Sequence, residues 1–334
     1  MTVKRKPTRR PATRGRSHGG AHVDPIRILV ASLAVVAAAI FFLPLLERMG
    51  VDVAPLMAMI WQPGDAQAAQ PVEGTAEVHF IDVGQASSIL IRGSQKTALI
   101  DGGEPGDAAA ILRYLEKTGV EKLDYFFNTH PHADHLGGCV EILKKMPTDE
   151  FIMTPLPEKL IPTTGGYRRL IEHLLSHKES ITTRQSAVGD QFELGGGLTL
   201  TTLGPVSEYD NLNDQSIVTR MEFGKTSFLF TGDMEDVAER DLLAAGALQP
   251  VTVLSAPHHG SNSSIDRDFL QQLCGSTPPI AVISCGVGND YGHPHKETLS
   301  IYDELGISYY RTDRQGSIRI LSDGDSLTVT TERD

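Results

Sequence analysis

The sequence predicts a layered α/β domain with mixed sheets over residues 76–334. Short apolar runs of strand length alternate with helical stretches along this region. The alternation occurs in both halves, and in both halves aspartate or histidine follows directly after a strand. No period of 20–50 residues is present that would indicate a repeat protein. The region therefore reads as one domain with polar groups gathered at strand ends.

The first half contains apolar runs rich in β-branched and aromatic residues, which predict strands. The predicted strands are residues 77–83, 87–93, 96–103 and 124–129. Two other stretches favour helices, at 107–117 and 136–146, and Pro147 is expected to end the second helix. The last of these strands runs directly into NTHPHADHLGG, at 128–138.

The second half repeats the pattern, with strands again followed by helices. The predicted strands are residues 198–204, 215–224, 226–233, 251–260, 280–286, 307–311, 317–322 and 326–331. The predicted helices are residues 235–245, 266–273 and 296–305. The three cysteines (Cys139, Cys274 and Cys285) are too few and too scattered to indicate a disulfide framework.

The N-terminal region predicts a membrane anchor. Residues 1–27 form a basic tail with eight Lys or Arg and one acid, and residues 28–46 carry no charge for nineteen residues. At about 1.5 Å per residue, that span is long enough for one bilayer crossing. The basic flank favours a cytoplasmic N-terminus, so residues 76–334 are expected outside the cell membrane as a single-pass, signal-anchored domain. Residues 47–75 read as a linker.

A cleaved signal peptide is the alternative interpretation of this region. Ala66 and Ala68 form an A-x-A pattern, but it lies far beyond the apolar core, which favours the uncleaved anchor. The basic tail is expected to contact anionic lipid. Since the whole chain carries −12 and residues 1–27 carry +7, residues 28–334 carry −19. So acidic a domain is a poor general binder of polyanions.

NTHPHADHLGG predicts a metal site. His130 and His132 project to the same side of an extended loop and can bind one ion together. Asp134 suits the N-cap of the following helix, and with His135 it can turn toward a second ion. Imidazole with carboxylate suits zinc, and also manganese or iron.

Other strand ends supply further candidate ligands. Asp233, in TGD, is placed where a carboxylate can bridge two metals, and His258 and His259 follow another strand in APHHGS. Asp82 and Asp101 also end apolar strands, although a strand-terminal aspartate is often a turn residue.

These motifs, in this order, resemble the metallo-β-lactamase superfamily, and more narrowly the extracellular hydrolase domain of ComEC-type DNA-internalisation competence proteins. The resemblance rests on VHFIDVGQASSILIRG, ALIDGG, NTHPHADHLGG, NDQSIVTRMEFGKTSFLFTGD, LSAPHHGSNSS, ISCGVGNDYGHPH and YRTDRQGSIRI, which span about residues 77–322. It implies a four-layer αββα sandwich with two divalent ions, zinc being expected and manganese the alternative.

The resemblance also implies roles for individual residues. His130 and His132 would bind the first metal, and Asp134, His135 and His258 the second. Asp233 would bridge the two metals, and Asp82 would support the histidine loop from outside the ligand set. His293 and His295 would line the substrate side.

Two stretches depart from the family pattern. Many superfamily hydrolases place another metal-binding histidine where this chain reads NLNDQS, so Asn213 or Asp214 is a candidate to assist the first metal. ComEC-type proteins often read DVGQGDS where this chain has Ala86 and Ser87. The ComEC-type channel of many helices is also absent from this sequence, which contains one predicted span.

The implied activity is hydrolysis of phosphodiesters, single-stranded DNA being a candidate substrate, by hydroxide that the metals generate near neutral pH. Asp134 or Asp233 would orient the water, and His293 or His295 would protonate the leaving oxygen. Two alternatives remain. One is a metallohydrolase acting on a β-lactam, a lactone or a cell-wall phosphoester, and the other is a non-catalytic binding module with a structural metal. The sequence identifies no protein partner.

Overall fold

A computed structural model describes residues 74–334. The predicted tail (1–27), membrane span (28–46) and all but the end of the linker (47–75) lie outside the described residues. Within 74–334, no helix is both long and apolar enough to cross a membrane. All three cysteines fall in this part of the chain, where they are buried and unpaired.

The first sheet has eight strands, in which β3 to β6 are parallel and the others antiparallel. Its order is β15 (Leu327–Thr331), β14 (Ile318–Ser322), β1 (Ala76–Phe80), β2 (Ile89–Arg92), β3 (Thr97–Ile100), β4 (Leu123–Asn128), β5 (Thr148–Met153) and β6 (Thr182–Gln185). Because β3 and β4 are parallel and in register, Ile100 pairs with Phe127 and the segments that follow them leave the same edge of the sheet.

The second sheet has seven strands, in which β10 to β13 are parallel. Its order is β13 (Ser308–Arg311), β12 (Ile280–Ile283), β11 (Val253–Ser255), β10 (Thr226–Phe230), β9 (Val218–Phe223), β8 (Leu198–Gly204) and β7 (Gln191–Gly195). The carboxyl ends of parallel strands meet at one edge, which is where open α/β sheets bind ligands.

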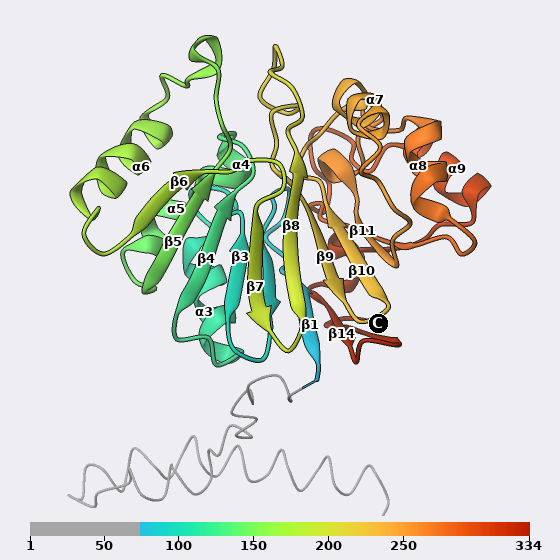
Figure 1. Cartoon of the computed structure of the whole chain (residues 1–334), viewed down its shortest axis with the longest axis horizontal. Helices are drawn as coiled ribbons and strands as arrows, with labels where there is room; N and C mark the ends of the chain where they lie inside the picture. The colour runs from blue at the N-terminus through green and yellow to red at the C-terminus, as the bar shows by residue number, and fades with distance from the viewer. Residues whose placement is uncertain (1–73) are drawn as a thin grey trace, which may run out of the picture. The chain divides into compact units, whose positions relative to one another are not determined.

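Helices cover the outer face of each sheet (Figure 1). Those of the first half are α3 (Ala108–Lys117), α4 (Ala133–Leu136), α5 (Cys139–Leu143), the 3-10 turn η1 (Glu158–Leu160) and α6 (Gly165–Ser176). Those of the second half are α7 (Asp236–Ala244), the 3-10 turn η2 (Pro257–Gly260), α8 (Arg267–Cys274), α9 (Lys296–Leu305) and α10 (Thr312–Gln315). Local chemistry sets their ends: the Asp266 carboxylate accepts from the Phe269 amide at the start of α8, and Gly306 ends α9 in the left-handed region.

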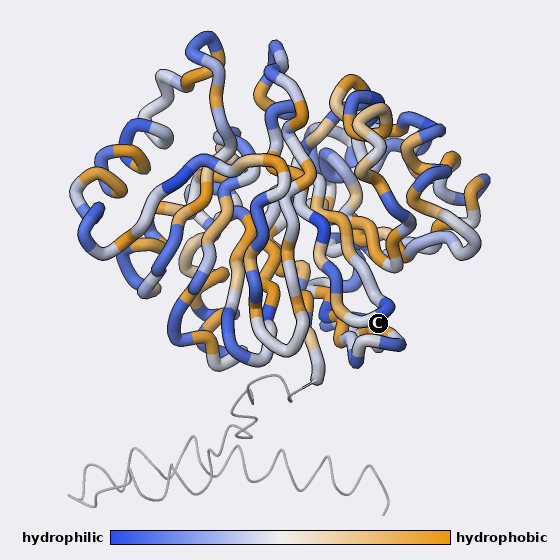
Figure 2. The backbone as a smooth tube through the Cα atoms, in the orientation of Figure 1, coloured by the Kyte–Doolittle hydropathy of each residue, from blue (hydrophilic) through white to orange (hydrophobic). Residues whose placement is uncertain are grey.

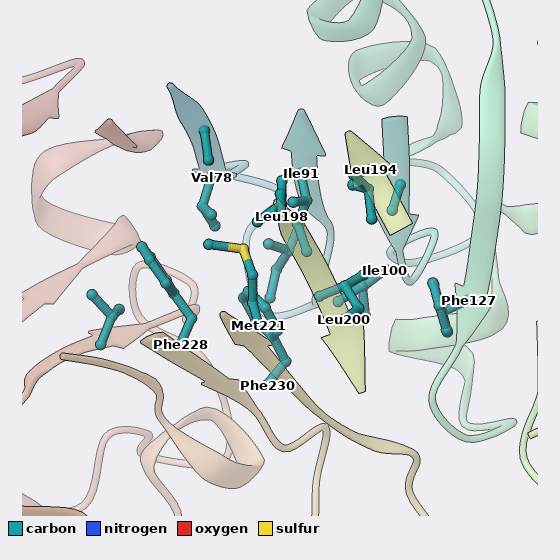
Figure 3. Packing of buried hydrophobic residues seen from close by; sticks show 14 of the residues in the cluster. Val78, Ile91, Ile100, Phe127, Leu194, Leu198, Leu200, Met221, Phe228 and Phe230 are labelled. Atoms are coloured by element: carbon teal, nitrogen blue, oxygen red, sulfur yellow. The ribbon is translucent and has the colours of Figure 1, made fainter. Parts of the chain in front are cut away.

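Three apolar clusters hold these layers together. The central cluster lies between the two sheets and includes Val78 and Phe127 from the first sheet and Met221 and Phe230 from the second (Figure 3). The other two fill the space between each sheet and its own helices. Hydrophobic segments accordingly follow the strands in the middle of the molecule, and hydrophilic segments follow the surface loops (Figure 2). The predicted α/β sandwich with two sheets is confirmed.

The structure differs from the sequence predictions in several regions: α10 was not predicted, and the strand predicted at 251–260 is β11 followed by η2. Residues 147–197 carry β5, α6, β6 and β7, none of which was predicted. Of the helix predicted at 136–146, residues 139–143 form α5 and only Leu136 lies in α4, before the break at Gly137 and Gly138. A Cβ on Gly138 would lie 2.2 Å from the Gly102 carbonyl oxygen. Glycine is therefore needed at this break, where the loop after β3 packs against it.

An ion cluster on β1 predicts a pH dependence of stability. Glu77 is buried beside His79, Arg92 and Arg319. Burial alone would raise its pKa, but hydrogen bonds from His79 and Arg319 and the charge of Arg319 outweigh burial and lower the pKa from 4.5 to about 2. A depressed carboxylate pKa stabilises the fold above the unfolded value, and this stabilisation is lost as pH falls toward the folded value.

We therefore expect Glu77→Gln to weaken the pH dependence of unfolding between about pH 4.5 and pH 2. The measurement is the urea midpoint of both proteins at pH 7, 4 and 3. The native protein should lose more stability than the variant both between pH 7 and pH 4 and between pH 4 and pH 3. Glu193→Gln, on an exposed position of β7, is the control and should follow the native curve. Parallel curves for Glu77→Gln and native protein would contradict the prediction.

Candidate metal centre

The candidate centre lies at the carboxyl ends of strands from both sheets. NTHPHADHLGG follows β4 of the first sheet, whereas Asp233 and His259 follow β10 and β11 of the second. Parallel pairing of β10 with β11, with Leu229 opposite Leu254, sends these two segments to the same edge. The fold thus brings together residues more than a hundred positions apart in sequence.

The geometry of the histidine loop agrees in part with the prediction. His130 Nε2 lies 3.0 Å from His132 Nδ1, so the two rings converge as the alternating spacing predicts. Helix α4 begins at Ala133, so His132 is the N-cap and Asp134, which was expected to be the N-cap, lies two positions after it in the first turn. His130 and His135 are buried, and Asp134 is half-buried.

Asp101, at the end of β3, anchors this loop from behind. Its carboxylate accepts hydrogen bonds from the Thr129 amide (2.8 Å) and hydroxyl (2.8 Å) and lies 2.7 Å from His135 Nδ1. Its φ of +63° lies in the left-handed region, which aspartate tolerates better than most residues. The supporting role expected of Asp82 therefore belongs to Asp101, and Asp82 instead pairs with Arg333 at the surface. The sequence signal for Asp101 was the strand-ending aspartate followed by Gly-Gly.

The structure reverses the two histidines of APHHGS. His258 was predicted beside Asp134 and His135, but His259 occupies that position, with its Nε2 3.3 Å from Asp134 Oδ2. Both residues have left-handed φ values, +45° and +55°. This turn after β11 reorients the backbone, so the second histidine enters the site, where its Nδ1 lies 2.8 Å from the Ser284 carbonyl oxygen.

Asp233 connects two groups of ligand atoms. Its Oδ1 lies 3.1 Å from His135 Nε2 and 3.6 Å from His259 Nε2. Its Oδ2 lies 3.7 Å from both His130 Nε2 and His258 Nε2. Two sets of converging atoms result, one from Asp134, His135, Asp233 and His259, the other from His130, His132 and Asp233. The predicted bridging position of Asp233 agrees with this geometry.

The donor set fits divalent metal ions. His135 Nε2 and His259 Nε2 are buried and have no hydrogen-bond partner among residues 74–334. Each ring's Nδ1 faces an acceptor, the Asp101 carboxylate or the Ser284 carbonyl, so each neutral ring carries its proton on Nδ1. The Nε2 lone pairs then point at carboxylate oxygens. A proton or a metal cation must lie between these facing atoms, and ligating histidines are commonly held in this way through the other nitrogen.

The electrostatics of the site also call for positive charge. Burial alone would lower the pKa of His135, but Asp233 and Asp101 outweigh it and hold the pKa well above its usual range. Burial would likewise raise the pKa of Asp134, but the close approach of His259 Nε2 and the charges of His135 and His259 hold it well below its usual range. In contrast, burial and the neighbouring His135 hold the pKa of His130 well below its usual value, which keeps its ring neutral and able to ligate.

A family model described as the metallo-beta-lactamase superfamily matches residues 81–273, more than half of the chain. The chain belongs to the metallo-beta-lactamase superfamily. The match includes the histidine loop, Asp233 and His259, and the resemblance predicted from the sequence is confirmed. The superfamily fold and the donor set together support a metal-dependent hydrolase.

Among curated proteins, the chain is 28% identical over 268 residues to ComE operon protein 3 of Bacillus subtilis, covering 73% of this chain and 32% of the relative. It is 27% identical over 251 residues to the uncharacterized protein YcaI of Escherichia coli, covering 73% and 30%. The chain thus spans about a third of the length of these relatives. The metallo-beta-lactamase fold protein YhfI of Bacillus subtilis is 11% identical, with a TM-score of 0.49, and the likeness covers 74% of this chain and 99% of YhfI.

The segment that departs from the superfamily pattern supports the site without ligating. Asp214 accepts from the Glu235 and Ala238 amides at the start of α7, so its carboxylate is turned toward the helix. Asn213 donates to Glu235. Ser216, rather than either candidate, reaches the histidines: its hydroxyl accepts from the Asp233 amide and lies 3.3 Å from His130 Nδ1.

Glu235 is a site residue that sequence reasoning missed. Its carboxylate lies 3.2 Å from His258 Nδ1 and accepts from Ser263 at 2.9 Å, which aims His258 Nε2 at Asp233. The hydrogen bond with His258 is the main cause that lowers the pKa of Glu235. The usable signal was the acid two positions after the superfamily aspartate, in TGDME.

His293 and His295 lie at the rim, on the segment after β12. The His293 ring stacks at 6.3 Å on His259, and its Nδ1 lies 3.2 Å from Gln85. Burial, with the nearby His259, His258 and His295, lowers the pKa of His293 to about 4. His295 Nδ1 accepts from the Asn262 amide at 2.9 Å, so its neutral ring carries a proton on Nε2.

Proposed function

We propose that this chain is a membrane-anchored, metal-dependent phosphodiesterase whose described domain acts outside the cell membrane. The observation that best supports this chemistry is the position of the Asp233 carboxylate. Its Oδ1 faces one group of ligand atoms and its Oδ2 faces the other. Two divalent ions about 3.5–4 Å apart stabilise both the attacking and the leaving oxygens of a displacement at phosphorus. Zinc suits these imidazole and carboxylate donors, and manganese is the alternative.

The chain's own residues have distinct tasks in this proposal. His130, His132, His135 and His259 hold the metals, and Asp134, which is half-buried, orients the attacking water. His295 donates a hydrogen bond from Nε2–H to the leaving oxygen and stabilises the charge that develops there, because its Nδ1 accepts from the Asn262 amide and its Nε2–H is left to face substrate. His293 remains neutral at pH 7 and positions substrate.

The phosphodiester class is supported by the resemblance of the sequence motifs to ComEC-type DNA-internalisation proteins, and the chain matches about a third of ComE operon protein 3. The membrane anchor and the outside location are supported by the uncharged span at 28–46 behind a basic tail. The charge of −19 over residues 28–334 opposes broad electrostatic capture of nucleic acid, so binding must depend on the metals and on uncharged contacts.

A substrate panel tests this function. We expect the metal-loaded protein to hydrolyse bis(p-nitrophenyl) phosphate and single-stranded DNA, and a chelator to abolish both activities. His132→Ala should be inactive, His295→Ala impaired, and His177→Ala, at an exposed histidine just after α6, unchanged. Activity is expected in the membrane fraction of cells, which tests the anchor.

Other outcomes identify other functions. Cleavage of nitrocefin or a lactone in place of the phosphodiesters would replace the proposal by another metallohydrolase. Metal binding without hydrolysis of any substrate would identify a non-catalytic binding module. A fully active His295→Ala variant would remove His295 from the reaction.

A further inference from the structure

The loop between β12 and α9 forms a rigid rim beside the metal centre. The Asn289 side chain donates to the carbonyls of Gly286 (2.9 Å) and His293 (2.7 Å) and accepts from the His293 amide (2.9 Å). Gln85, from the other sheet, accepts from the Gly286 amide and contacts His293 Nδ1. The conformation of this loop is therefore stabilised by the Asn289 hydrogen bonds within it and by the contacts of Gln85 from the other half of the domain.

Tyr291 is presented outward by this loop. The residue is 68% exposed, which is more than is usual for tyrosine, a residue type of intermediate burial. One face of the ring stacks on His293, with centroids 5.6 Å apart and planes inclined by 24°. His293 in turn stacks on the metal-site His259 at 6.3 Å and 20°. A series of nearly parallel rings thus leads from the metal centre to an open aromatic face.

We propose that Tyr291 is the stacking platform for a nucleobase next to the phosphodiester held at the metal centre. This inference rests on the proposed phosphodiesterase function and names its substrate class as single-stranded nucleic acid. Stacking of a base on an aromatic side chain contributes about 1–3 kcal/mol and tolerates any base, because every base has a π face. A platform already fixed by Asn289 and His293 binds without the cost of ordering a loop.

Because the domain is acidic, an uncharged contact such as stacking is better suited to binding a nucleic-acid strand than a charged contact. Affinity for single strands is otherwise supplied mainly by Lys and Arg along the backbone, and residues 28–334 carry −19. Stacking on Tyr291 adds affinity without requiring positive charge. It also favours a strand with exposed bases over a duplex, in which the bases are already stacked.

The test uses the metal-loaded full chain and three substitutions in one loop. Tyr291→Ala removes the ring, Tyr291→Phe keeps it, and Val287→Ala changes another exposed apolar residue of the loop, 78% exposed, as the matched control. We expect Tyr291→Ala to raise KM for an oligothymidylate about tenfold while kcat changes little. Tyr291→Phe and Val287→Ala should behave as the native protein. An oligonucleotide with abasic residues beside the cleaved bond should be insensitive to Tyr291→Ala.

A binding measurement separates the platform from the reaction. Fluorescence anisotropy with a labelled phosphorothioate oligothymidylate, which resists cleavage, should show the same tenfold weakening in Tyr291→Ala. Ring-dependent binding without cleavage of the normal strand would retain the platform and overturn the phosphodiesterase function. Cleavage with a native KM in Tyr291→Ala would overturn the platform and retain the function. A native protein that neither binds nor cleaves the strand would overturn both.

Discussion

Replacing His259 with alanine is expected to lower the affinity for metal by more than about a hundredfold. An outer partner of a ligand typically costs 10–100-fold when lost, and His259 supplies a ligand atom directly. Its Nε2 is buried, unpartnered within the described residues and directed at Asp134 and Asp233. Affinity can be measured by competition with a chromogenic chelator and hydrolysis on the same samples.

His258 is the matched comparison, because it is the neighbouring residue of the same type. It is half-buried and already paired with Glu235, so His258→Ala should weaken metal binding by no more than about tenfold. The reverse order, with His258→Ala the more damaging variant, would favour the sequence-based assignment over the structural one. Circular-dichroism melting curves of both variants check that the fold is retained.

Replacing Asp101 with asparagine is expected to lower metal affinity about 10–100-fold without unfolding the protein. Asparagine has nearly the same shape and tolerates the left-handed φ of +63°, so the loop after β3 is preserved. What is lost is the negative charge that faces His135 Nδ1 at 2.7 Å and fixes the proton on that nitrogen. The ring then holds its Nε2 lone pair toward the metal less firmly.

Asp82→Asn is the control for Asp101→Asn, since both aspartates follow apolar strands of the first sheet. Asp82 pairs with Arg333 rather than with the histidine loop, so its substitution should leave the metal affinity close to native. Chelator competition measures both variants. Equal losses in the two would show that the Asp101 carboxylate has no particular role.

Most of the fold could be predicted where local pattern and tertiary context agree. Inner strands such as β10 (TSFLF) and β12 (IAVI) are continuous apolar runs because both faces of their sheet are covered, so their sequences identify them without further information. The segment 147–197 was not predictable in the same way. β6 reads TTRQ and is mostly exposed at the edge of its sheet, and α6 begins with two glycines. Packing against neighbours, not local propensity, forms these elements.

The sequence by itself determined the chemistry of the candidate centre. Histidines and aspartates at strand ends, in NTHPHADHLGG, TGD and APHHGS, indicate metal binding because these are the side chains that ligate zinc, and parallel strands bring their ends together. The tertiary structure decided which residue performs which task. Two left-handed residues after β11 choose His259 over His258, and a left-handed Asp101 replaces Asp82 behind the loop. Such choices depend on the backbone direction of a single turn, which residue spacing does not encode.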